Sequence, residues 1–421
     1  MDSALKGARY KVTTLLIALY AITYLDRVCI SVAGPRIQED LHIDTVSWGW
    51  VTGMFGLAYC IFEIPSGTLG DRIGSRTVLT RIVLWWSAFT ALTGAMTGYY
   101  PLLLVRFLFG AGEAGAFPNG FAVISRWFKA SERATMLGVA LMSAQLGGAL
   151  APLLVIPIQM RFGWRASFFC FGLLGVIWSA VWYAWYRDSP EEKLGVTAEG
   201  ERAASHDGGH EFPWRIAFRS QSVVAMLVLA FSYIYTVGFF QTWFHTFLVK
   251  GRGFSEGNLL ISALPYAIAA CANLLGGAAS DALVRRFGRT KGRRGLGVIS
   301  LATAGLLVIL VMATRAQTLT VILLALAYGA ITFQQSGACG VCLDISHRSA
   351  GAMTGLFNTA SYLGSLVGSV AYGYIAERFG YDAPFVPMAG LLFLGAIAWM
   401  RIDASEQLAP EGVGIGAEAL T

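Results

Sequence analysis

The stretch Thr13-Thr-Leu-Leu-Ile-Ala-Leu-Tyr-Ala-Ile-Thr-Tyr24-Leu-Asp26-Arg27-Val-Cys-Ile-Ser-Val-Ala33 is long and apolar enough to cross a membrane, yet it carries an acid and a base. A charged side chain at bilayer depth costs about 2.5–3.5 kcal/mol on insertion scales, so such residues usually face a protein interior or a watery cavity. Asp26 and Arg27 are therefore predicted to mark the path of a substrate or an ion.

The composition of the whole chain places it among membrane proteins with many spans. Hydrophobic residues make up 56% of its 421 residues, charged residues only 13%, and the mean hydropathy is +0.59. Such a chain is too apolar for a soluble protein. The net charge of +6 is attributed to cytoplasmic loops rather than to a nucleic-acid partner. We find no H-E-x-x-H, P-loop or G-x-S-x-G signature, so no enzyme is expected.

Apolar runs of about 20 residues, the length that a spanning helix needs, predict an all-α membrane protein with twelve transmembrane helices. Most of the 31 Lys and Arg residues then fall on the side of the N-terminus, so both termini are predicted to be cytoplasmic. The predicted spans are 12–34, 46–69, 77–97, 101–124, 135–158, 165–186, 222–249, 257–281, 296–314, 317–342, 351–375 and 383–402.

The longest polar stretch separates spans six and seven and divides the chain. We expect an N-terminal six-helix half (1–186), a cytoplasmic linker (187–221) and a C-terminal six-helix half (222–421) with a short polar tail. His206 and His210 in the linker offer two ligands in a Gly-rich segment, which is a poor metal site. The six cysteines fall in apolar spans without zinc-ligand spacing, so neither a metal nor a cofactor is expected.

A sequence signal recurs at the ends of the second and the eighth spans. Gly67-Thr-Leu-Gly-Asp71-Arg72-Ile-Gly-Ser-Arg closes span two, and Asp281, followed by Arg285-Arg-Phe-Gly, closes span eight. The recurrence at about half the chain length predicts an internal repeat. Parallel six-helix repeats around a central cavity are one architecture of secondary transporters, with the substrate near the midplane.

These residues resemble the major facilitator superfamily, whose loop between spans two and three has the pattern G-x-x-x-D-R-x-G-x-R. The resemblance implies two pseudo-symmetric six-helix bundles. Only glycine lets helix and loop backbones approach closely, and a helix-end Asp beside Arg can make an ion-paired latch that breaks when the cytoplasmic side opens. The residues expected in this gate are Gly67, Asp71, Arg72, Asp281 and Arg285.

A narrower resemblance covers most of the chain. The Tyr24-Leu-Asp26-Arg27 stretch, Arg106-Phe-Leu-Phe-Gly-Ala-Gly-Glu113-Ala-Gly-Ala-Phe-Pro and Gly-Trp-Arg165 are similar to motifs of the anion:cation symporter family. That family includes bacterial transporters of galactonate, glucarate, hexuronates, tartrate and phthalate. The resemblance implies proton-coupled uptake of an organic anion. We expect a monomer in the inner (plasma) membrane whose partners are a small organic anion, a proton and the lipid bilayer.

The same resemblance implies roles for particular residues. By position, the carboxylate-binding arginine falls on Arg27, and the protonatable acids fall on Asp26 and Glu113. Further pocket residues implied by position are Tyr59, Arg106, Gln145 and Asn358. The second half adds polar and aromatic groups in span seven, namely Gln241, Trp243 and His245. This run departs from the family's Trp-x-Pro-x-Tyr pattern, and His245 is expected either to shape the anion pocket or to be a hydrogen-bonded packing residue.

Spacing within span four agrees with a shared binding wall. Arg106 and Glu113 are seven residues apart, which is two helical turns and about 10 Å along one face. Two arginines at similar depth suit a carboxylate, which Arg binds bidentately. The alternative is a static buried network in which the charges of Asp26, Arg27, Arg106 and Glu113 only neutralise one another. Glu63, near the cytoplasmic end of span two, is expected either to contact a base in a gate or to reach interfacial water.

Energetics gives the reason to expect protons. Bringing a monovalent anion into a cell that is about 100 mV negative inside costs about 2.3 kcal/mol, and one co-transported proton cancels that charge. We therefore predict a secondary transporter, a proton-coupled symporter that takes up a sugar acid or another monocarboxylate by alternating access. An anion exchanger is the nearest alternative. An anion channel or sensor is a further one, although it would need no titratable acids.

Overall fold

Helices make up all the regular structure of the described residues, 2–128, 130–189, 217–345 and 350–406, in the computed structural model. The predicted all-α class is confirmed. In chain order the helices are α1 (Asp2–Asp40), α2 (Thr45–Ile73), α3 (Ser75–Ala95), α4 (Tyr99–Glu113), α5 (Ala116–Trp127), α6 (Ala130–Phe162), α7 (Trp164–Trp185), α10 (Gln221–Thr242), α11 (Phe244–Thr246), the π-helix η1 (Phe247–Gly251), the 3₁₀-helix η2 (Glu256–Ala263), α12 (Leu264–Phe287), α13 (Arg289–Ala313), α14 (Gln317–Phe333), α15 (Gln335–Ile345), α16 (Ala350–Phe379) and α17 (Phe385–Arg401).

Each of the twelve predicted spans lies on one helix or on consecutive helices, but three of them are interrupted. The fourth span is divided after Glu113, the seventh at Trp243 and the tenth at Gln334. Spans four and ten hold the same place in the two halves, so their interruptions follow the pseudo-symmetry of the fold. Nine helices of the described residues have the length and hydropathy of a membrane span, and α17 is a shorter apolar helix.

Most of the predicted linker, residues 190–216 with His206 and His210, lies outside the described residues. The boundaries 1–186 and 222–421 therefore stay predictions. Among the residues that are described, no group of three or more His, Cys, Asp or Glu side chains lies close enough together to hold a metal ion.

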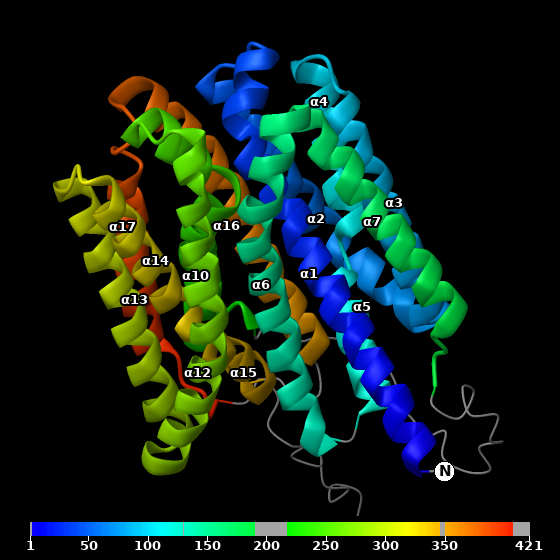
Figure 1. Cartoon of the computed structure of the whole chain (residues 1–421). Coiled ribbons are helices and arrows are strands. Elements are labelled where there is room, and N and C mark those ends of the chain that lie inside the picture. Colours follow the sequence, from blue (N-terminus) through cyan, green and yellow to red (C-terminus); the bar gives the residue numbers. More distant parts are fainter. Residues whose placement is uncertain (1, 129, 190–216, 346–349, 407–421) are drawn as a thin grey trace, which may run out of the picture.

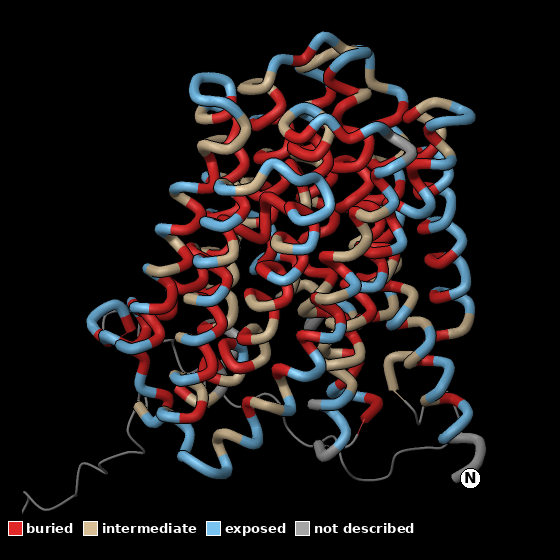
Figure 2. The backbone as a smooth tube through the Cα atoms, turned by 60° about the vertical axis from the view of Figure 1, so that its left-hand side comes forward, coloured by how far each residue is buried: buried red, intermediate tan, exposed pale blue. Residues whose placement is uncertain are grey.

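The outer surface of the bundle is apolar. Figure 2 shows exposed residues along the whole length of the helices and not only at their ends. Many are large hydrophobic residues, and Leu173, Ile177, Leu275 and Ile299 are 53% to 69% exposed. Such a surface is favourable in lipid and unfavourable in water. Helices suit this setting because they satisfy their own backbone hydrogen bonds where no water is present.

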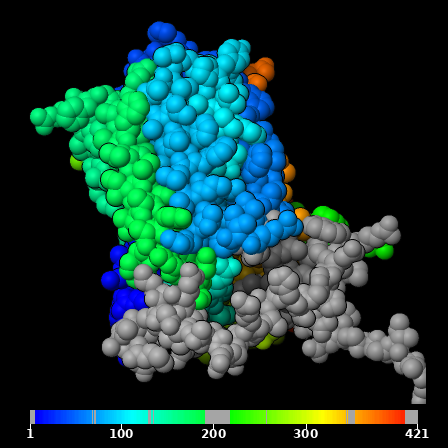
Figure 3. Space-filling model, turned by 90° about the vertical axis from the view of Figure 1, so that its right-hand side faces the viewer, coloured from blue at the N-terminus to red at the C-terminus, as the bar shows by residue number. Residues whose placement is uncertain are grey.

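The long helices run between two ends of one bundle (Figure 1). We call the end that carries the N-terminus the N-terminal end, and the other, where α1 turns into α2, the far end. We call helices α1 to α7 the first part of the chain and helices α10 to α17 the second part. The most extensive contacts within the first part are α1 with α6, α2 with α4 and α3 with α7. Within the second part they are α10 with α16, α12 with α14 and α13 with α17. Figure 3 shows a face built by the first part, with α7 in green beside α3 and α4 in blue to cyan.

The two parts meet chiefly where α2 packs against α16, and glycines bring these backbones into contact. A Cβ added at Gly49 would lie 2.9 Å from the Ser369 carbonyl oxygen, and one added at Gly56 would lie 3.1 Å from the Tyr362 carbonyl oxygen. Small residues let helices pack this closely within a membrane. We call this contact of α16 with Gly49, Gly53 and Gly56 the glycine seam. The interface also includes contacts of α6 with η2 and α12, and of α1 with α10 and α11.

Candidate functional site

Arg27 lies inside the bundle and is surrounded by aromatic rings. Its side chain is 5% exposed. Its guanidinium carbon lies 4.9 Å from the centre of the Phe55 ring, 5.0 Å from Tyr59, 5.5 Å from Tyr24 and 5.7 Å from Phe117. A cation within about 6 Å of a ring face is attracted by the ring quadrupole, and more strongly where water is excluded. These four rings, which we call the aromatic cage, stabilise a charge that is otherwise costly in the membrane.

The interruption of the fourth span places Glu113 beside Arg27. α4 ends at Glu113, and Gly115 has a left-handed backbone with φ of 90° before α5 begins. A Cβ on Gly115 would lie 2.4 Å from the Ser66 hydroxyl oxygen, so only glycine fits there. The Asn119 side-chain amide donates to the Gly115 carbonyl at 2.8 Å and supports the turn. The prediction of one continuous helix over 101–124 is therefore wrong at this point.

Arg27 and Glu113 form a buried ion pair, in which Arg27 Nε donates to Glu113 Oε1. Arg27 Nη1 also donates to the hydroxyl of Tyr362 on α16 at 3.3 Å. Arg27 Nη2 and Glu113 Oε2 are buried and have no hydrogen-bond partner among the described residues. An unpaired buried polar group is costly. Mutual neutralisation therefore accounts for one contact of this pair and leaves Arg27 Nη2 and Glu113 Oε2 without a partner in the described part of the chain.

Asp26 and Arg106 lie beside this pair and are less completely bonded. Both carboxylate oxygens of Asp26, and Nε of Arg106, are buried without a hydrogen-bond partner in the described part of the chain. Asp26 lies near Trp86 and Thr90 of α3 and interacts electrostatically with Glu113 and Arg106. The fold thus brings together the four charged side chains that the sequence placed within spans one and four.

Two tyrosines connect the ion pair to the second part of the chain. Tyr59 of α2 stacks on Tyr362 of α16 with 4.0 Å between ring centroids. One turn earlier on α16, Asn358 donates to Glu63 Oε1 at 2.8 Å. Glu63 is only 4% exposed, and in this structure it pairs with an amide of the second part of the chain, neither a base nor the interfacial water expected from the sequence. Tyr59 and Asn358 therefore lie on the α2–α16 contact beside Arg27.

Three aromatic residues of this site were not predicted: Phe55, Phe117 and Tyr362. Aromatic residues make up 13% of the chain, so no single ring stands out in the sequence. Of the three, only Tyr362 could have been predicted from the sequence. It follows the predicted pocket residue Asn358 by four residues, so the two must lie on the same face of their helix.

Two predicted glutamines lie at other contacts between the parts of the chain. Gln145 of α6 accepts a hydrogen bond from the hydroxyl of Tyr328 on α14 at 3.2 Å. Gln241, near the end of α10, is half-buried and within interaction range of Tyr24 in the aromatic cage. Gln241 thereby lies next to the aromatic cage, whereas Gln145 is connected to Tyr24 and Arg27 through Tyr328.

Trp243 and His245 are bonded within the protein in this conformation. Trp243 is fully buried and donates to the Ser369 carbonyl of α16 at 3.0 Å. His245 is fully buried, with Nδ1 3.0 Å from the Ser31 hydroxyl of α1 and Nε2 2.8 Å from the Ser262 hydroxyl of η2. Both ring nitrogens of His245 are engaged, which matches the hydrogen-bonded packing role.

Further hydrogen bonds join the two parts at the far end. Gln38 donates to the Thr246 hydroxyl at 3.2 Å, and Lys250 donates to Gln38 Oε1 at 3.0 Å. We call these contacts, together with the His245 hydrogen bonds, the far-end seal. At the N-terminal end, α5 and α15 make no extensive contact in the part of the chain that the structure describes.

The predicted gate residues lie in the last turns of α2 and α12, which point to the N-terminal end of the bundle. They are Gly67, Asp71, Arg72, Asp281 and Arg285. The side chains of the last three are exposed, and the side chain of Asp71 lies outside what the structure describes. The ion pair observed nearby joins Arg126 of α5 to Asp188 after α7 at 3.4 Å. The latch on Asp71 stays a prediction.

Comparison with known proteins agrees with this architecture. Residues 16–369 match the Major Facilitator Superfamily. The chain is 32% identical over 406 residues to the probable sulfoacetate transporter SauU of Cupriavidus necator, covering 94% of both chains, and 28% identical over 391 residues to the hexuronate transporter of Bacillus subtilis, covering 90% of this chain and 91% of that one. Its fold is similar to the crystal structure of a bacterial homologue of the human lysosomal transporter Spinster in an inward-facing and unoccupied conformation, with a TM-score of 0.77, 20% identity and coverage of 93% and 96% of the two chains. The chain therefore belongs to the major facilitator superfamily, and within it to the anion:cation symporter family.

Proposed function

We propose that this chain is a secondary transporter that takes up a small organic anion, a sugar acid or another monocarboxylate, together with protons by alternating access. The observation that carries the proposal is the buried Arg27–Glu113 pair, in which Arg27 Nη2 and Glu113 Oε2 have no partner among the described residues. Relatives named for sulfoacetate and hexuronate support an anionic substrate, because both molecules carry a carboxylate.

The substrate and Glu113 compete for one cation in this mechanism. A substrate carboxylate that approaches Arg27 Nη2 meets the like charge of Glu113, which opposes binding at low dielectric. When Glu113 takes up a proton, this repulsion disappears and Arg27 is free to form two parallel N–H hydrogen bonds to the carboxylate. The aromatic cage keeps the guanidinium in place while its partner changes. Proton and anion therefore bind together.

Access from the N-terminal end fits the described conformation. The far-end seal joins the two halves at one end, whereas α5 and α15 lack extensive contact at the other within the described residues. We assign the N-terminal end to the cytoplasm, because most Lys and Arg residues lie there. The state is then inward-facing. To open the outer side, the far-end seal must break while α5 and α15 approach each other. The glycine seam, which lies on the part of α2 nearer the far end, is the contact about which the two parts rotate.

Uptake by proteoliposomes tests the proposal. The purified chain would be given a panel of sugar acids, other monocarboxylates, sulfonated acids and neutral sugars, with the pH gradient and the membrane voltage set independently. We expect accumulation of one or a few acids that rises with an inward proton gradient, and no uptake of neutral sugars. Accumulation that ignores the pH gradient but needs a second anion inside would make the chain an exchanger, the second candidate. Absence of uptake for every acid would contradict the proposal.

A further inference from the structure

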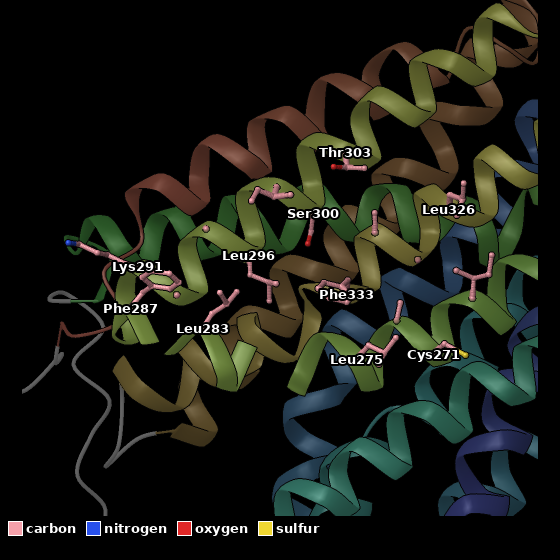
Figure 4. A pocket seen from close by; sticks show the side chains of 17 residues that line it. Cys271, Leu275, Leu283, Phe287, Lys291, Leu296, Ser300, Thr303, Leu326 and Phe333 are labelled. Atoms are coloured by element: carbon pink, nitrogen blue, oxygen red, sulfur yellow. The ribbon is translucent and has the colours of Figure 1, made fainter. Parts of the chain in front are cut away.

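A groove on the outer surface of the bundle has no part in this transport mechanism. It lies between α12, α13 and α14 and has a volume of about 700 Å³. Its walls are apolar: Leu275, Leu283 and Phe287 of α12 face Leu296 of α13 and Phe333 of α14 (Figure 4). Leu275 and Phe287 are 61% and 51% exposed, so the groove opens toward the lipid.

A glycine on α13 keeps the groove open. A Cβ added at Gly295 would meet no atom within 4 Å, so no neighbouring backbone requires glycine at this position. A larger side chain there would enter the groove, because Gly295 is one of the lining residues and is exposed. Space of this kind beside exposed apolar walls is filled in a membrane by the chain of a lipid.

One end of the groove is positively charged. Among the described residues that line it, only Lys291 is charged. Figure 4 shows Lys291 and Phe287 at one end of the groove, with Leu326 and Cys271 at the other. Lys291 is exposed in the first turn of α13. The cap residue of this helix, Gly288, has no side chain to accept hydrogen bonds from the first-turn N–H groups. A cation next to a helix N-terminus favours an anion.

The length of the groove matches one leaflet of a bilayer. The lining residues of α13 extend from Lys291 to Thr303, which is about 18 Å along a helix. Half of a hydrocarbon core is about 15 Å. We propose that the groove binds one acyl chain of an anionic phospholipid from the leaflet at the N-terminal end, with the lipid phosphate held by Lys291. A zwitterionic lipid would offer the same chain but less charge complementarity.

Native mass spectrometry of the delipidated full-length protein tests this proposal. Phosphatidylglycerol and phosphatidylcholine with the same acyl chains would be titrated into wild type, Gly295→Leu and Lys291→Gln. Gly390→Leu is the matched control, because Gly390 is also exposed on a helix and a Cβ there meets no atom within 4 Å. We expect the first binding step of phosphatidylglycerol to weaken about fivefold in Lys291→Gln, equivalent to about 1 kcal/mol for one cation at an anionic lipid surface.

Gly295→Leu should remove the same binding step for both lipids, and Gly390→Leu should leave it unchanged. Gly295→Leu acts on the acyl chain of the lipid and Lys291→Gln acts on its headgroup. A folding defect in one variant therefore leaves the other variant as a valid test. Equal affinity of wild type for the two lipids, or unchanged phosphatidylglycerol binding in Gly295→Leu, would overturn the proposal and leave only unspecific lipid contact.

Discussion

Arg27 is held in the centre of the bundle by four aromatic rings and one carboxylate. The rings attract the cation whatever the charge of Glu113, whereas the carboxylate does so only while it is ionised. Neutralising Glu113 therefore frees N–H donors without expelling the guanidinium from its place. This division of roles makes the two residues separable by mutation.

Arg27→Lys should lose most substrate binding. A lysine ammonium keeps the charge but lacks the planar fork that binds a carboxylate bidentately. Hydrogen bonds to charged groups contribute about 1.5–3 kcal/mol, so we expect affinity to fall by about 10-fold to 100-fold. The measurement is equilibrium binding of the acid identified by uptake to the purified variants, with Arg161→Lys on the exposed surface as the control. Wild-type affinity in Arg27→Lys would exclude this role.

Glu113→Gln imitates the protonated acid permanently. It should bind substrate and exchange it across the membrane, but it should lose accumulation driven by a pH gradient because no proton moves with the anion. Exchange and gradient-driven uptake would be compared in the same liposomes, with Glu377→Gln, at an exposed position, as the control. If Glu113→Gln kept full concentrative uptake with unchanged pH dependence, the coupling site would lie elsewhere.

The charged residues of this site could be predicted from the sequence, but their surroundings could not. Asp26, Arg27, Arg106 and Glu113 stand out because charges are rare and costly within spans. Arg27 pairs with Glu113, while Asp26 accepts no hydrogen bond from the residues that the structure describes. This choice depends on how α1 and α4 are rotated and displaced against each other. Apolar patterns do not determine such small displacements.

At the scale of elements, the interruption between α4 and α5 determines where Glu113 lies. A continuous helix would extend beyond Glu113, whereas the turn at Gly115 ends α4 at Glu113. The prediction of a span over 101–124 had the right limits and the wrong continuity. Glycines are frequent in membrane helices, so the sequence alone did not distinguish Gly115, which bends the chain, from Gly110, which packs against Phe55.

Gly115→Ala should destabilise the protein. A left-handed backbone costs a non-glycine residue about 1–2 kcal/mol, and the new Cβ would also overlap the Ser66 hydroxyl. Unfolding of the purified variant in detergent should therefore begin at a lower denaturant concentration than in wild type. Gly98→Ala is the control, because Gly98 has extended backbone and open space around it. Equal midpoints for the two variants would show that the turn is not strained.

At the scale of the whole molecule, hydropathy predicted the all-α membrane class, and the repeated motif, through its resemblance to a known family, implied the fold. The all-α class and the major facilitator architecture are confirmed, because the bilayer allows few ways to satisfy the backbone. The access state could not be predicted. It depends on a few hydrogen bonds at the far end, such as those of His245 to Ser31 and Ser262, which another state would replace.

Locking the far end should stop transport. A Cβ at Gly34 would lie 3.2 Å from the Thr246 hydroxyl oxygen, the atom whose place a cysteine sulfur at 246 would take, so two cysteines here could form a disulfide. Gly34→Cys with Thr246→Cys, in a background without the native cysteines, should lose uptake on oxidation and regain it on reduction. Each single variant, treated with the same oxidant, should keep its uptake. Transport that persists after complete cross-linking would rule out the far-end seal as a gate.

The glycine seam has an entropic consequence for the proposed rotation. Glycines have no side-chain rotamers to order or release, so rotation about Gly49, Gly53 and Gly56 changes little side-chain entropy at the axis. The balance between the two access states is then left to polar contacts, chiefly hydrogen bonds of the far-end seal at about 0.5–1.5 kcal/mol each. A total of a few kcal/mol lies within the differential affinity of a small ligand for two states. A metabolite that binds one state more tightly than the other by this amount is thus enough to shift their populations.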